Sequence, residues 1–288
     1  FLGPWLVQRP DAIHVVHPPI TVGLPAWVLS RWWRIPFTME IQDMWPENLE
    51  STGMVRSRRI LGLVGAFASW VYRGSVGIRV ISPGFLRNLI EKRVPPHKVR
   101  VISNWVDADY YSPREPNREL AARYGMAGRF NVLYAGTIGL AQGLDVVLAA
   151  AESLRLSLPD VQFVLAGDGL DYERLKLEAQ TRGLSNVRFL GRLTGDCMPA
   201  LYACANVLFL HLKHDPLFAM TIPHKVFTYL ASSKPVLVGG EGDVVRIVVE
   251  SRAGLACAPS DPDALANSVA ALYSKSVVER DAMGKNGR

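Results

Sequence analysis

Short apolar segments alternate with longer segments of helical periodicity through the second half of the chain, and this alternation constrains the fold more than any other feature. The apolar segments cover residues 131–135, 162–166, 187–190, 207–210, 236–238 and 255–257. Continuous apolar strands joined by crossover helices predict an α/β fold with a parallel sheet that is covered on both faces. Ligands in such folds bind beyond the carboxyl ends of the strands, so the loops at that edge are the first candidates for a site.

The first half of the chain contains a similar but shorter pattern. Strands are predicted at residues 13–17, 37–42, 78–81 and 99–102, with helical segments at 22–33 and 56–73. Residues 105–116 lack helical periodicity and are rich in Asp, Tyr, Ser and Pro, which is typical of a linker. With 288 residues, of which 49% are hydrophobic, the chain can bury more than one core. We therefore predict two domains, residues 1–108 and 109–288.

The beginning of the chain and its cysteines bear on processing and compartment. The chain starts at Phe1 rather than Met, and its first residues match neither a signal peptide nor a transit peptide, so we expect the first domain to be incomplete at its start. The three cysteines are odd in number and lack a Cys-x-x-Cys spacing, which indicates a reducing compartment without a disulfide framework.

The net charge is unevenly distributed between the two predicted domains. Residues 1–108 contain 13 Lys and Arg against 7 Asp and Glu, whereas residues 109–288 contain 19 of each kind, so the whole excess of +6 lies in the first domain. A basic surface of this kind can serve nucleic acid, an anionic membrane or a phosphorylated acceptor. No nucleic-acid-binding motif accompanies it, so we expect no nucleic-acid partner.

Glycines follow three successive strands of the second domain. The candidate residues in these loops are Gly136, Thr137, Gly139, Gly167, Gly191 and Arg192. Because glycine has no side chain, backbone N–H groups in such loops can closely approach a phosphate or a sugar. The alternative is that each glycine only permits a tight turn.

A predicted helix beginning at residues 221–223 lies between the strands 207–210 and 236–238. Pro223 is tolerated in a first turn, Thr221 can cap the free N–H groups, and such helix starts attract anions. Lys225, one turn further, can add a full charge, and Thr228 lies on the same polar side. An ordinary amphipathic helix is the alternative interpretation.

Two further patterns allow both a functional and a structural interpretation. His211, His214, Asp215 and His224 cluster in the sequence, but they straddle a loop and a helix start, so we predict neither a metal nor another cofactor. Arginines at 56, 58 and 59 precede a charge-free stretch, residues 60–72, whose apolar residues recur at helical spacing. This pattern fits a helix lying in the surface of an anionic membrane, or a helix that buries its stripe in the core.

Both domains contain short motifs that are typical of one enzyme family. In the second domain they are YAGTIGLAQGLD (134–145), LAGDG (165–169), FLGR (189–192), TIPHKVFTYLA (221–231) and MGKNGR (283–288). In the first domain they are IQDMWPE (41–47), ISPG (81–84) and ISNWVD (102–107). Together these motifs resemble the retaining GT-B glycosyltransferases of family 4, in particular bacterial enzymes of capsule, colanic acid and O-antigen assembly of the fucosaminyltransferase type. The resemblance covers nearly the whole chain.

The resemblance implies two facing Rossmann-like domains, with the donor held mainly by the second. It assigns the diphosphate to the 136–139 loop, the base to residues 191–193, and the diphosphate and ribose to the Lys225–Thr228 side of the helix. The Arg and Lys that many members carry in the first loop are replaced by Thr137 and Gln142, which leaves more of the phosphate charge to Lys225. The family's Glu-x7-Glu positions hold Met220 and Thr228 here.

The resemblance assigns the acceptor to the first domain, where Asp43, Trp45 and Glu47 follow the predicted strand 37–42. Asp43 is expected to orient the acceptor, because in this family the leaving phosphate is thought to take the acceptor proton. Alternatively, Asp43 begins a turn and Glu47 is solvated.

We predict transfer of a sugar, with retention, from a UDP- or GDP-linked donor to a polyprenyl-linked saccharide in bacterial surface polysaccharide synthesis. The enzyme would work in the cytoplasm, peripherally on the inner face of the plasma membrane. The open alternatives are another GT-B enzyme, such as a nucleotide-sugar 2-epimerase, and a non-catalytic donor-binding protein.

Overall fold

A computed structural model describes residues 8–288, which divide into two compact units. The first unit extends to Asn104 and also includes Asp215–Ile222, whereas the second comprises Trp105–His214 and Pro223–Arg288. The sequence did not predict that the later segment leaves the second unit. It does so because Leu217, Phe218 and Met220 pack into the hydrophobic core of the first unit.

The first unit is built on a four-stranded parallel sheet with the order β1-β2-β3-β4. Its strands are β1 (Ile13–His17), β2 (Phe37–Ile41), β3 (Gly77–Val80) and β4 (Val99–Val101). Its helices are η1 (Ile20–Val22), α2 (Gly23–Trp33), α3 (Glu47–Ser51), α4 (Arg58–Gly74), α5 (Pro83–Glu91), η2 (Pro96–Lys98) and α10 (Pro216–Met220).

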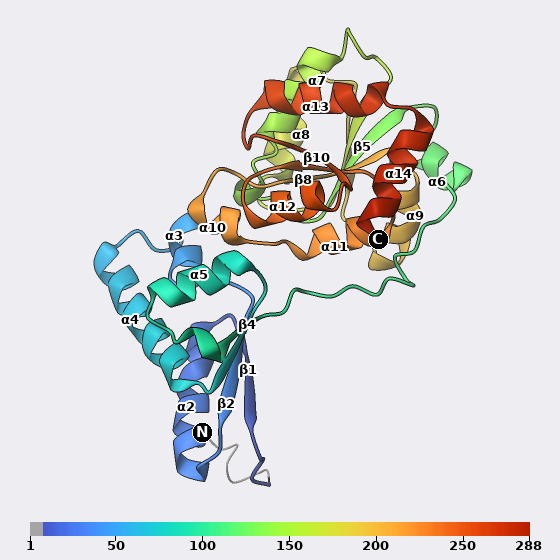
Figure 1. The fold of residues 1–288 in the computed structure, drawn as a ribbon. Coiled ribbons are helices and arrows are strands. Elements are labelled where there is room, and N and C mark those ends of the chain that lie inside the picture. Colours follow the sequence, from blue (N-terminus) through green and yellow to red (C-terminus); the bar gives the residue numbers. More distant parts are fainter. Residues whose placement is uncertain (1–7) are drawn as a thin grey trace. The chain divides into compact units, whose positions relative to one another are not determined.

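The apolar residues of this sheet are gathered on one face. Val15, Met39 and Ile78 occupy aligned positions of neighbouring strands and are buried with residues of α2, α4 and α5. Figure 1 shows these three helices together beside the strands. On the other face, the Glu40 carboxylate forms an ion pair with the Arg79 guanidinium, with an N–O distance of 2.6 Å. The period-2 alternation of each strand thus places the helices on a single side.

The second unit is built on a six-stranded parallel sheet with the order β10-β9-β8-β5-β6-β7. Its strands are β5 (Phe130–Ala135), β6 (Val161–Ala166), β7 (Val187–Gly191), β8 (Val207–His211), β9 (Val236–Gly239) and β10 (Gly254–Cys257). Its helices are α6 (Arg118–Arg123), η3 (Leu140–Gln142), α7 (Asp145–Leu154), α8 (Tyr172–Thr181), η4 (Gly195–Cys197), α9 (Met198–Ala203), α11 (His224–Ala231), α12 (Asp243–Glu250), α13 (Pro262–Ser274) and α14 (Val277–Gly287).

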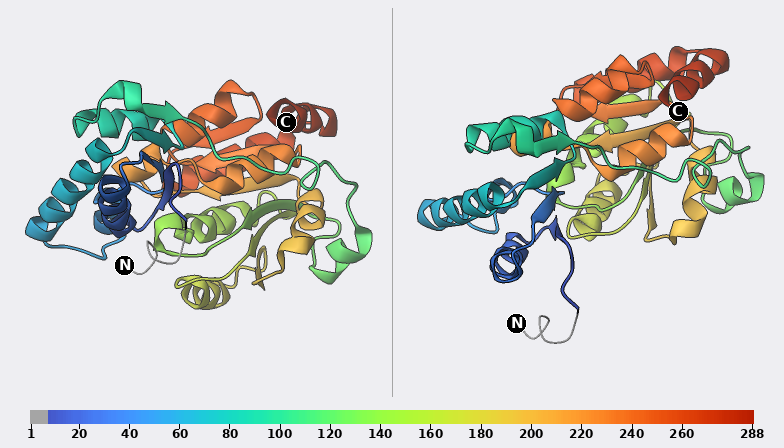
Figure 2. Two further views of the ribbon diagram at one scale, coloured as in Figure 1. Left: turned by 90° about the horizontal axis from the view of Figure 1, so that it is seen from below. Right: turned by 60° about the horizontal axis from the view of Figure 1, so that its bottom comes forward.

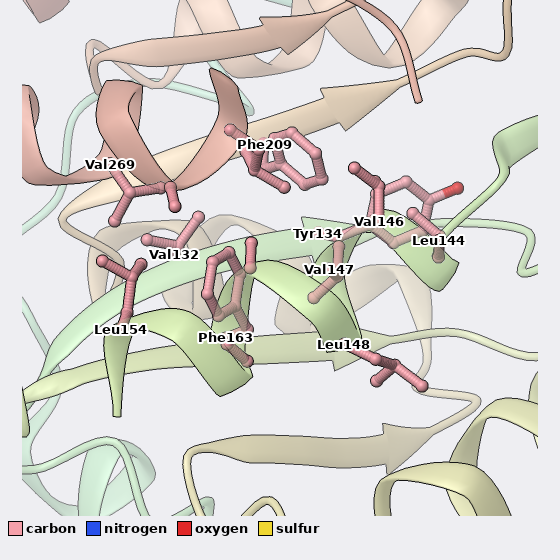
Figure 3. Close-up of a cluster of buried hydrophobic side chains, with 14 of the residues drawn as sticks. Val132, Tyr134, Leu144, Val146, Val147, Leu148, Leu154, Phe163, Phe209 and Val269 are labelled. Carbon is pink, nitrogen blue, oxygen red and sulfur yellow. The ribbon is translucent and has the colours of Figure 1, made fainter. Parts of the chain in front are cut away.

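Helices cover both faces of this second sheet. Figure 1 shows α7 and α13 on one side and α11 and α12 on the other. On the first side, strand residues such as Val132, Phe163 and Phe209 pack against Val147 and Val269, as Figure 3 shows. Most of the central strands are buried on both faces, which explains why they are continuously apolar in the sequence.

The predicted strands are all present, with ends that differ from the prediction by at most one residue. The predicted linker is also present, since residues 105–116 run to α6 without a helix or strand (Figure 2). The predicted start of the helix at residues 221–223 is wrong, because α11 begins at His224. Thr221 instead ends α10, and its hydroxyl donates to the Leu217 carbonyl at 2.8 Å, so it caps no N–H group of α11.

Within residues 8–288, no helix combines the length and the apolar character needed to cross a membrane.

Candidate functional site

A cavity of about 460 Å³ lies at the carboxyl ends of β5, β6 and β7 in the second unit. Its lining residues are Gly136, Thr137, Ala166, Gly167, Asp168, Gly169, Arg192, Leu193 and Met198. All of them belong to the strand ends and the loops that follow, or to the start of α9. Such a site beside the carboxyl edge of a parallel sheet is where α/β folds bind their ligands.

Two glycines allow the loops of this cavity to pack on one another. Gly136 has a φ of 139° and Gly167 a φ of 144°, values that other residues rarely adopt. A Cβ on Gly167 would lie 1.8 Å from the Gly136 carbonyl oxygen, and a Cβ on Gly136 would lie 2.5 Å from Nζ of Lys225. Glycine is therefore required for both contacts.

Lys225 lies directly against the first glycine loop, although α11 carries it from far along the chain. Its Nζ donates a hydrogen bond to the Tyr134 hydroxyl at 2.7 Å and stands 4.0 Å above the centre of the same ring. The Tyr134 hydroxyl in turn donates to the Thr137 carbonyl. The ammonium is thus held beside the backbone of residues 136–137.

The electrostatic surroundings of Lys225 are unusual for a lysine. Burial lowers the pKa of Lys225 to about 7. Its hydrogen-bond partner is a neutral phenol, and no ion pair joins it to a carboxylate within the described part of the chain. A bound anion would restore the stability of the charged form, because an opposite charge at close range raises the pKa of a lysine.

Most of the predicted donor residues come together at this place. Gly136, Thr137, Gly167 and Arg192 line the cavity. Gly191 supports the lining, because its carbonyl accepts a hydrogen bond from Gly167 N–H at 2.8 Å. Gly139 lies further along the first loop, where its N–H donates to Oε1 of Gln142 at 3.1 Å.

The other predicted residues on the 221–228 segment have different surroundings. Thr221 belongs to the first unit, and Pro223 immediately precedes α11 without a side-chain cap. Thr228 is only 5% exposed and donates its hydroxyl to the Lys225 carbonyl at 2.9 Å. The side of α11 that carries Thr228 was expected to be open to a ligand. This expectation is wrong at Thr228, because α11 packs there against Tyr202.

The predicted acceptor residues lie in the first unit, at the carboxyl end of β2. Glu47 forms an ion pair with Lys92 at 2.8 Å and accepts a hydrogen bond from Nδ2 of Asn88 at 2.9 Å. Burial opposes ionisation of Glu47, but the Lys92 charge and these hydrogen bonds hold its pKa below the ordinary value. Glu47 is thus a structural anchor rather than the solvated residue of the alternative interpretation. Lys92 also donates to the Trp45 carbonyl at 3.0 Å.

Asp43 and Trp45 form the central part of the same loop. Burial raises the pKa of Asp43, and a hydrogen bond to Asn48 opposes the rise. The Trp45 ring contacts His17 edge to face, with centroids 5.7 Å apart. His17 is fully buried at the end of β1, and burial lowers its pKa to about 4, so it is neutral near pH 7.

The histidines considered as metal ligands have separate structural partners. Nδ1 of His211 hydrogen-bonds to the Gln142 carbonyl, and Nε2 accepts from Ser260 N–H at 3.0 Å. His214 pairs with Glu241 at 2.9 Å, and His224 hydrogen-bonds to the Trp105 carbonyl at 2.9 Å. No group of three or more His, Cys, Asp or Glu in residues 8–288 is placed to hold a metal ion.

The partners that fix these side chains were not predicted from the sequence. Tyr134 and Tyr229 hold Lys225 and its helix, and Lys92 and His17 hold the loop around Trp45. Tyr134 stands two residues before the first glycine, which was the available signal. Lys92 is 45 residues from Glu47, so no local pattern could join them.

Comparison with known proteins identifies both halves of the chain. Residues 120–288 match the family Glycosyl transferases group 1, and residues 2–105 match the Glycosyl transferase 4-like domain. The probable glycosyltransferase WbjE of Pseudomonas aeruginosa is 26% identical over 234 residues, which cover 80% of this chain and 58% of WbjE. WcaI of Escherichia coli K12, whose name assigns it to colanic acid biosynthesis, is 26% identical over 83% of this chain and 60% of its own length. The chain therefore spans about three fifths of these relatives.

Solved structures give the fold. The crystal structure of Anabaena HepE with UDP superimposes with a TM-score of 0.79 at 17% identity, covering 96% of this chain and 72% of HepE. HepE has also been solved with UDP-glucose. Both sheets are parallel and the structural neighbours have the GT-B fold, as predicted. The family matches extend over most of the sequence, and the chain belongs to the group 1 glycosyltransferases.

Proposed function

We propose that this chain binds a nucleoside diphosphate sugar in its second unit and transfers the sugar, with retention, to a polyprenyl-linked saccharide acceptor held by its first unit. The observation that carries the proposal is the position of Lys225. Its ammonium lies against the Gly136 backbone with a neutral phenol as its hydrogen-bond partner. A diphosphate supplies the negative charge that this ammonium lacks, and the surrounding glycine loops offer backbone N–H groups.

The base and ribose are assigned to the remaining lining of the cavity. Leu193 and Met198 provide apolar surface, while Arg192 and Asp168 provide polar groups. Crystal structures of HepE contain UDP and UDP-glucose, which supports a nucleotide-sugar donor here. UDP and GDP remain the two donor classes to be tested.

The loop containing Asp43 and Trp45 is the proposed acceptor site. Asp43 has a raised pKa through burial and a carboxylate held by Asn48, so it is suited to accept a hydrogen bond from an acceptor hydroxyl. Trp45 offers a ring for packing against a sugar. In the retaining mechanism that we propose, the leaving diphosphate takes the acceptor proton and Asp43 orients the hydroxyl.

An anionic membrane is the proposed location of the acceptor. The first half of α4 exposes Ile60 and Leu63, by 50% and 73%, beside the exposed arginines 56, 58 and 59. The second half instead buries Ala68, Val71 and Tyr72 in the core. The first half of α4 therefore fits a helix that lies on a membrane surface, whereas its second half is an ordinary helix packed on the core.

This arrangement suits work on the inner face of a bacterial plasma membrane in surface polysaccharide synthesis. The relationship to WcaI, with its assignment to colanic acid biosynthesis, favours that role. The exposed half of α4 is close to the acceptor loop in the first unit, since a Cβ on Gly65 would lie 3.5 Å from Pro46. A lipid-linked saccharide would thus be presented beside Asp43.

Turnover of radiolabelled nucleotide sugars tests the proposal. The protein should transfer label from one UDP- or GDP-sugar to a polyprenyl-linked saccharide and should release little label without the acceptor. An Asp43→Asn variant should retain donor binding and lose most transfer. Absence of transfer with every donor and lipid-linked acceptor, despite nucleotide binding, would contradict the transferase role.

One alternative has a specific observation in its favour. Thr228 stands at the second Glu position of the family's Glu-x7-Glu signature, and it is buried with its hydroxyl bonded within α11. A chain without that carboxylate could bind the donor and transfer nothing. If this alternative is correct, the same assay should show nucleotide binding without transfer. If the chain is an epimerase, the assay should show isomerisation of the donor sugar without an acceptor.

A further inference from the structure

β5 and β8 separate at the point where the strand order of the second sheet reverses. Their pairing includes only Val132 with Val207 and Leu133 with Leu208, whereas β5 stays paired with β6 as far as Ala135. The chain adds β6 and β7 on one side of β5 and β8 to β10 on the other. This reversal point is where doubly wound sheets open a crevice.

The phenol of Tyr229 occupies the backbone positions that β8 leaves free. Ala135 N–H donates to the Tyr229 hydroxyl at 2.9 Å, and that hydroxyl donates to the Ala135 carbonyl at 3.2 Å. Tyr229 is completely buried, so these bonds satisfy polar groups that would otherwise be unpaired in the interior. A side chain of α11 therefore replaces a strand as the partner of Ala135, directly before Gly136.

Tyr134 makes the reciprocal contact. It extends from β5 and accepts the hydrogen bond from Nζ of Lys225 at 2.7 Å, while Tyr229 extends from α11 to β5. Residues 225 and 229 are one helical turn apart, so both contacts join the same turn of α11 to the same strand end. We call Tyr134 and Tyr229 the tyrosine clamp.

We propose that the tyrosine clamp positions Lys225 for the donor diphosphate, by fixing the separation between this lysine and the Gly136 loop. The proposal rests on the proposed function, in which those two groups bind the diphosphate. The clamp keeps the charged lysine in place before the ligand binds. The entropic cost of ordering this side chain on binding is therefore smaller. Tyr134 and Tyr229 are thus positioning residues and not catalytic residues.

The two tyrosines act on Lys225 in different ways. Tyr134 contacts the ammonium itself, through its hydroxyl and through the ring 4.0 Å below, and so stabilises the charged form. The hydroxyl of Tyr229 instead hydrogen-bonds to the backbone of Ala135 and so sets the position of the helix. The other titratable groups around the site are Tyr202 from α9 and Asp168 and Arg192 from the cavity loops, and none of them forms an ion pair with Lys225 among the described residues.

Calorimetric titration with UDP and GDP between pH 6 and pH 9 separates these contributions, with each affinity referred to the fully ionised nucleotide, whose phosphate titrates at about pH 6. In Tyr134→Phe the pH above which affinity declines should shift downward, with affinity near pH 8 reduced roughly tenfold. In Tyr229→Phe affinity should fall roughly tenfold at every pH, with an unchanged midpoint. Tyr273→Phe is the control, because Tyr273 packs edge to face against Phe130, the first residue of β5, whereas the clamp acts at Tyr134 and Ala135 at the end of that strand. Wild-type affinity and midpoint in both clamp variants would overturn the proposal.

A ligand-free measurement keeps the inference separate from the proposed function. Protein with ¹³C-labelled lysine, assigned with Lys225→Met, should show a Lys225 titration midpoint that is lower in Tyr134→Phe than in wild type. An unchanged midpoint would overturn the role of Tyr134 even if no nucleotide binds. Conversely, a wild-type chain that binds neither UDP nor GDP contradicts the proposed function whatever the lysine titration shows.

Discussion

At the scale of single residues, the proposed diphosphate site is built on a lysine that is partly buried beside a neutral partner. The pKa of Lys225 is about 7 in the free protein, and a bound diphosphate raises it, so binding takes up a proton above pH 7. Nucleotide affinity should therefore be greatest below the free pKa and should fall by up to about tenfold per pH unit above it.

Calorimetry of UDP binding between pH 7.5 and pH 9 checks this dependence, because the nucleotide phosphate is already ionised in that range (pKa about 6). Lys225→Met should bind weakly and without a pH dependence. Affinity in the wild type that stays constant across this range would show that the lysine does not contact the phosphates.

The same lysine has a predictable effect on stability. Its pKa is lowered from the ordinary value of 10.5, so the unfolded state binds more protons between about pH 7 and pH 10.5, and stability rises with pH through that window. Below pH 7 the full cost of burying the charge remains. Lys225→Met should accordingly raise the thermal midpoint at pH 7 by about 2–4 °C, the shift for roughly 1 kcal/mol in a domain of this size. A lower midpoint would mean that the lysine stabilises the free protein.

Thr228 provides a prediction about burial. Its side chain stands at a Glu position of the family signature but lies inside the unit, next to Tyr202. A carboxylate at this position would be desolvated, so the variant should melt at a lower temperature than wild type without nucleotide. Thr228→Ser keeps the hydroxyl and is the matched control. Equal melting of Glu and Ser variants would show that the position opens to solvent.

At the scale of secondary-structure elements, α4 gives the clearest prediction. Basic residues near anionic lipid contribute about 1 kcal/mol each, so the arginines at 56, 58 and 59 can supply roughly 3 kcal/mol of salt-sensitive attraction. We expect the protein to float with anionic liposomes and not with neutral ones. Changing the three arginines to Ser should reduce flotation, and Leu63→Ser should remove the part that persists at high salt.

The control for α4 is a triple change of exposed arginines in the second unit, Arg118, Arg123 and Arg155, to Ser. It removes the same charge and should leave flotation unchanged. Circular dichroism confirms that both triple variants are folded. Equal flotation of the α4 variant and wild type would exclude this surface.

The elements also show what local sequence can and cannot predict. Strands such as β5 and β6 were predictable because they are buried on both faces and therefore uniformly apolar. The start of α11 was not predictable in the same way. Thr221 and Pro223 suggested a helix cap, but Thr221 still belongs to the segment that packs in the first unit. That segment joins the first unit because Leu217 packs into its core. A surface helix could have the same apolar pattern, so the sequence alone does not predict this packing.

The candidate sites were predictable to the extent that they follow the strands. Gly136, Gly167 and Arg192 could be located because the carboxyl ends of parallel strands meet at one edge. The partners that tune the site could not be located. Tyr229 and Ala135, for example, are 94 residues apart and are joined by a side chain that replaces a strand.

At the scale of the whole molecule, the two units divide the chemistry that we propose. The second unit carries the glycine loops and Lys225, and the first carries the Asp43 loop and α4. The basic excess lies in the first 108 residues, where the charge of α4 contributes to it, whereas the proposed nucleotide site lies in a part of the chain without net charge. Donor affinity should therefore depend on the local geometry of the proposed nucleotide site in the second unit. Attraction to an anionic membrane should depend on the charge of the first unit.

The central claim is that Lys225 and the Gly136 loop bind the diphosphate of a nucleotide sugar, and calorimetric titration at pH 7 tests it most directly. Wild-type chain should bind UDP or GDP at one site, and Lys225→Met should lose roughly 1.5–3 kcal/mol of binding free energy, the range for hydrogen bonds to charged groups. Lys176→Met is the matched control, since Lys176 also stands over a tyrosine ring, at 5.5 Å, but on α8 and outside the lining of the cavity. Equal nucleotide affinity of wild type and Lys225→Met, or no binding of either nucleotide by the wild type, would contradict the account.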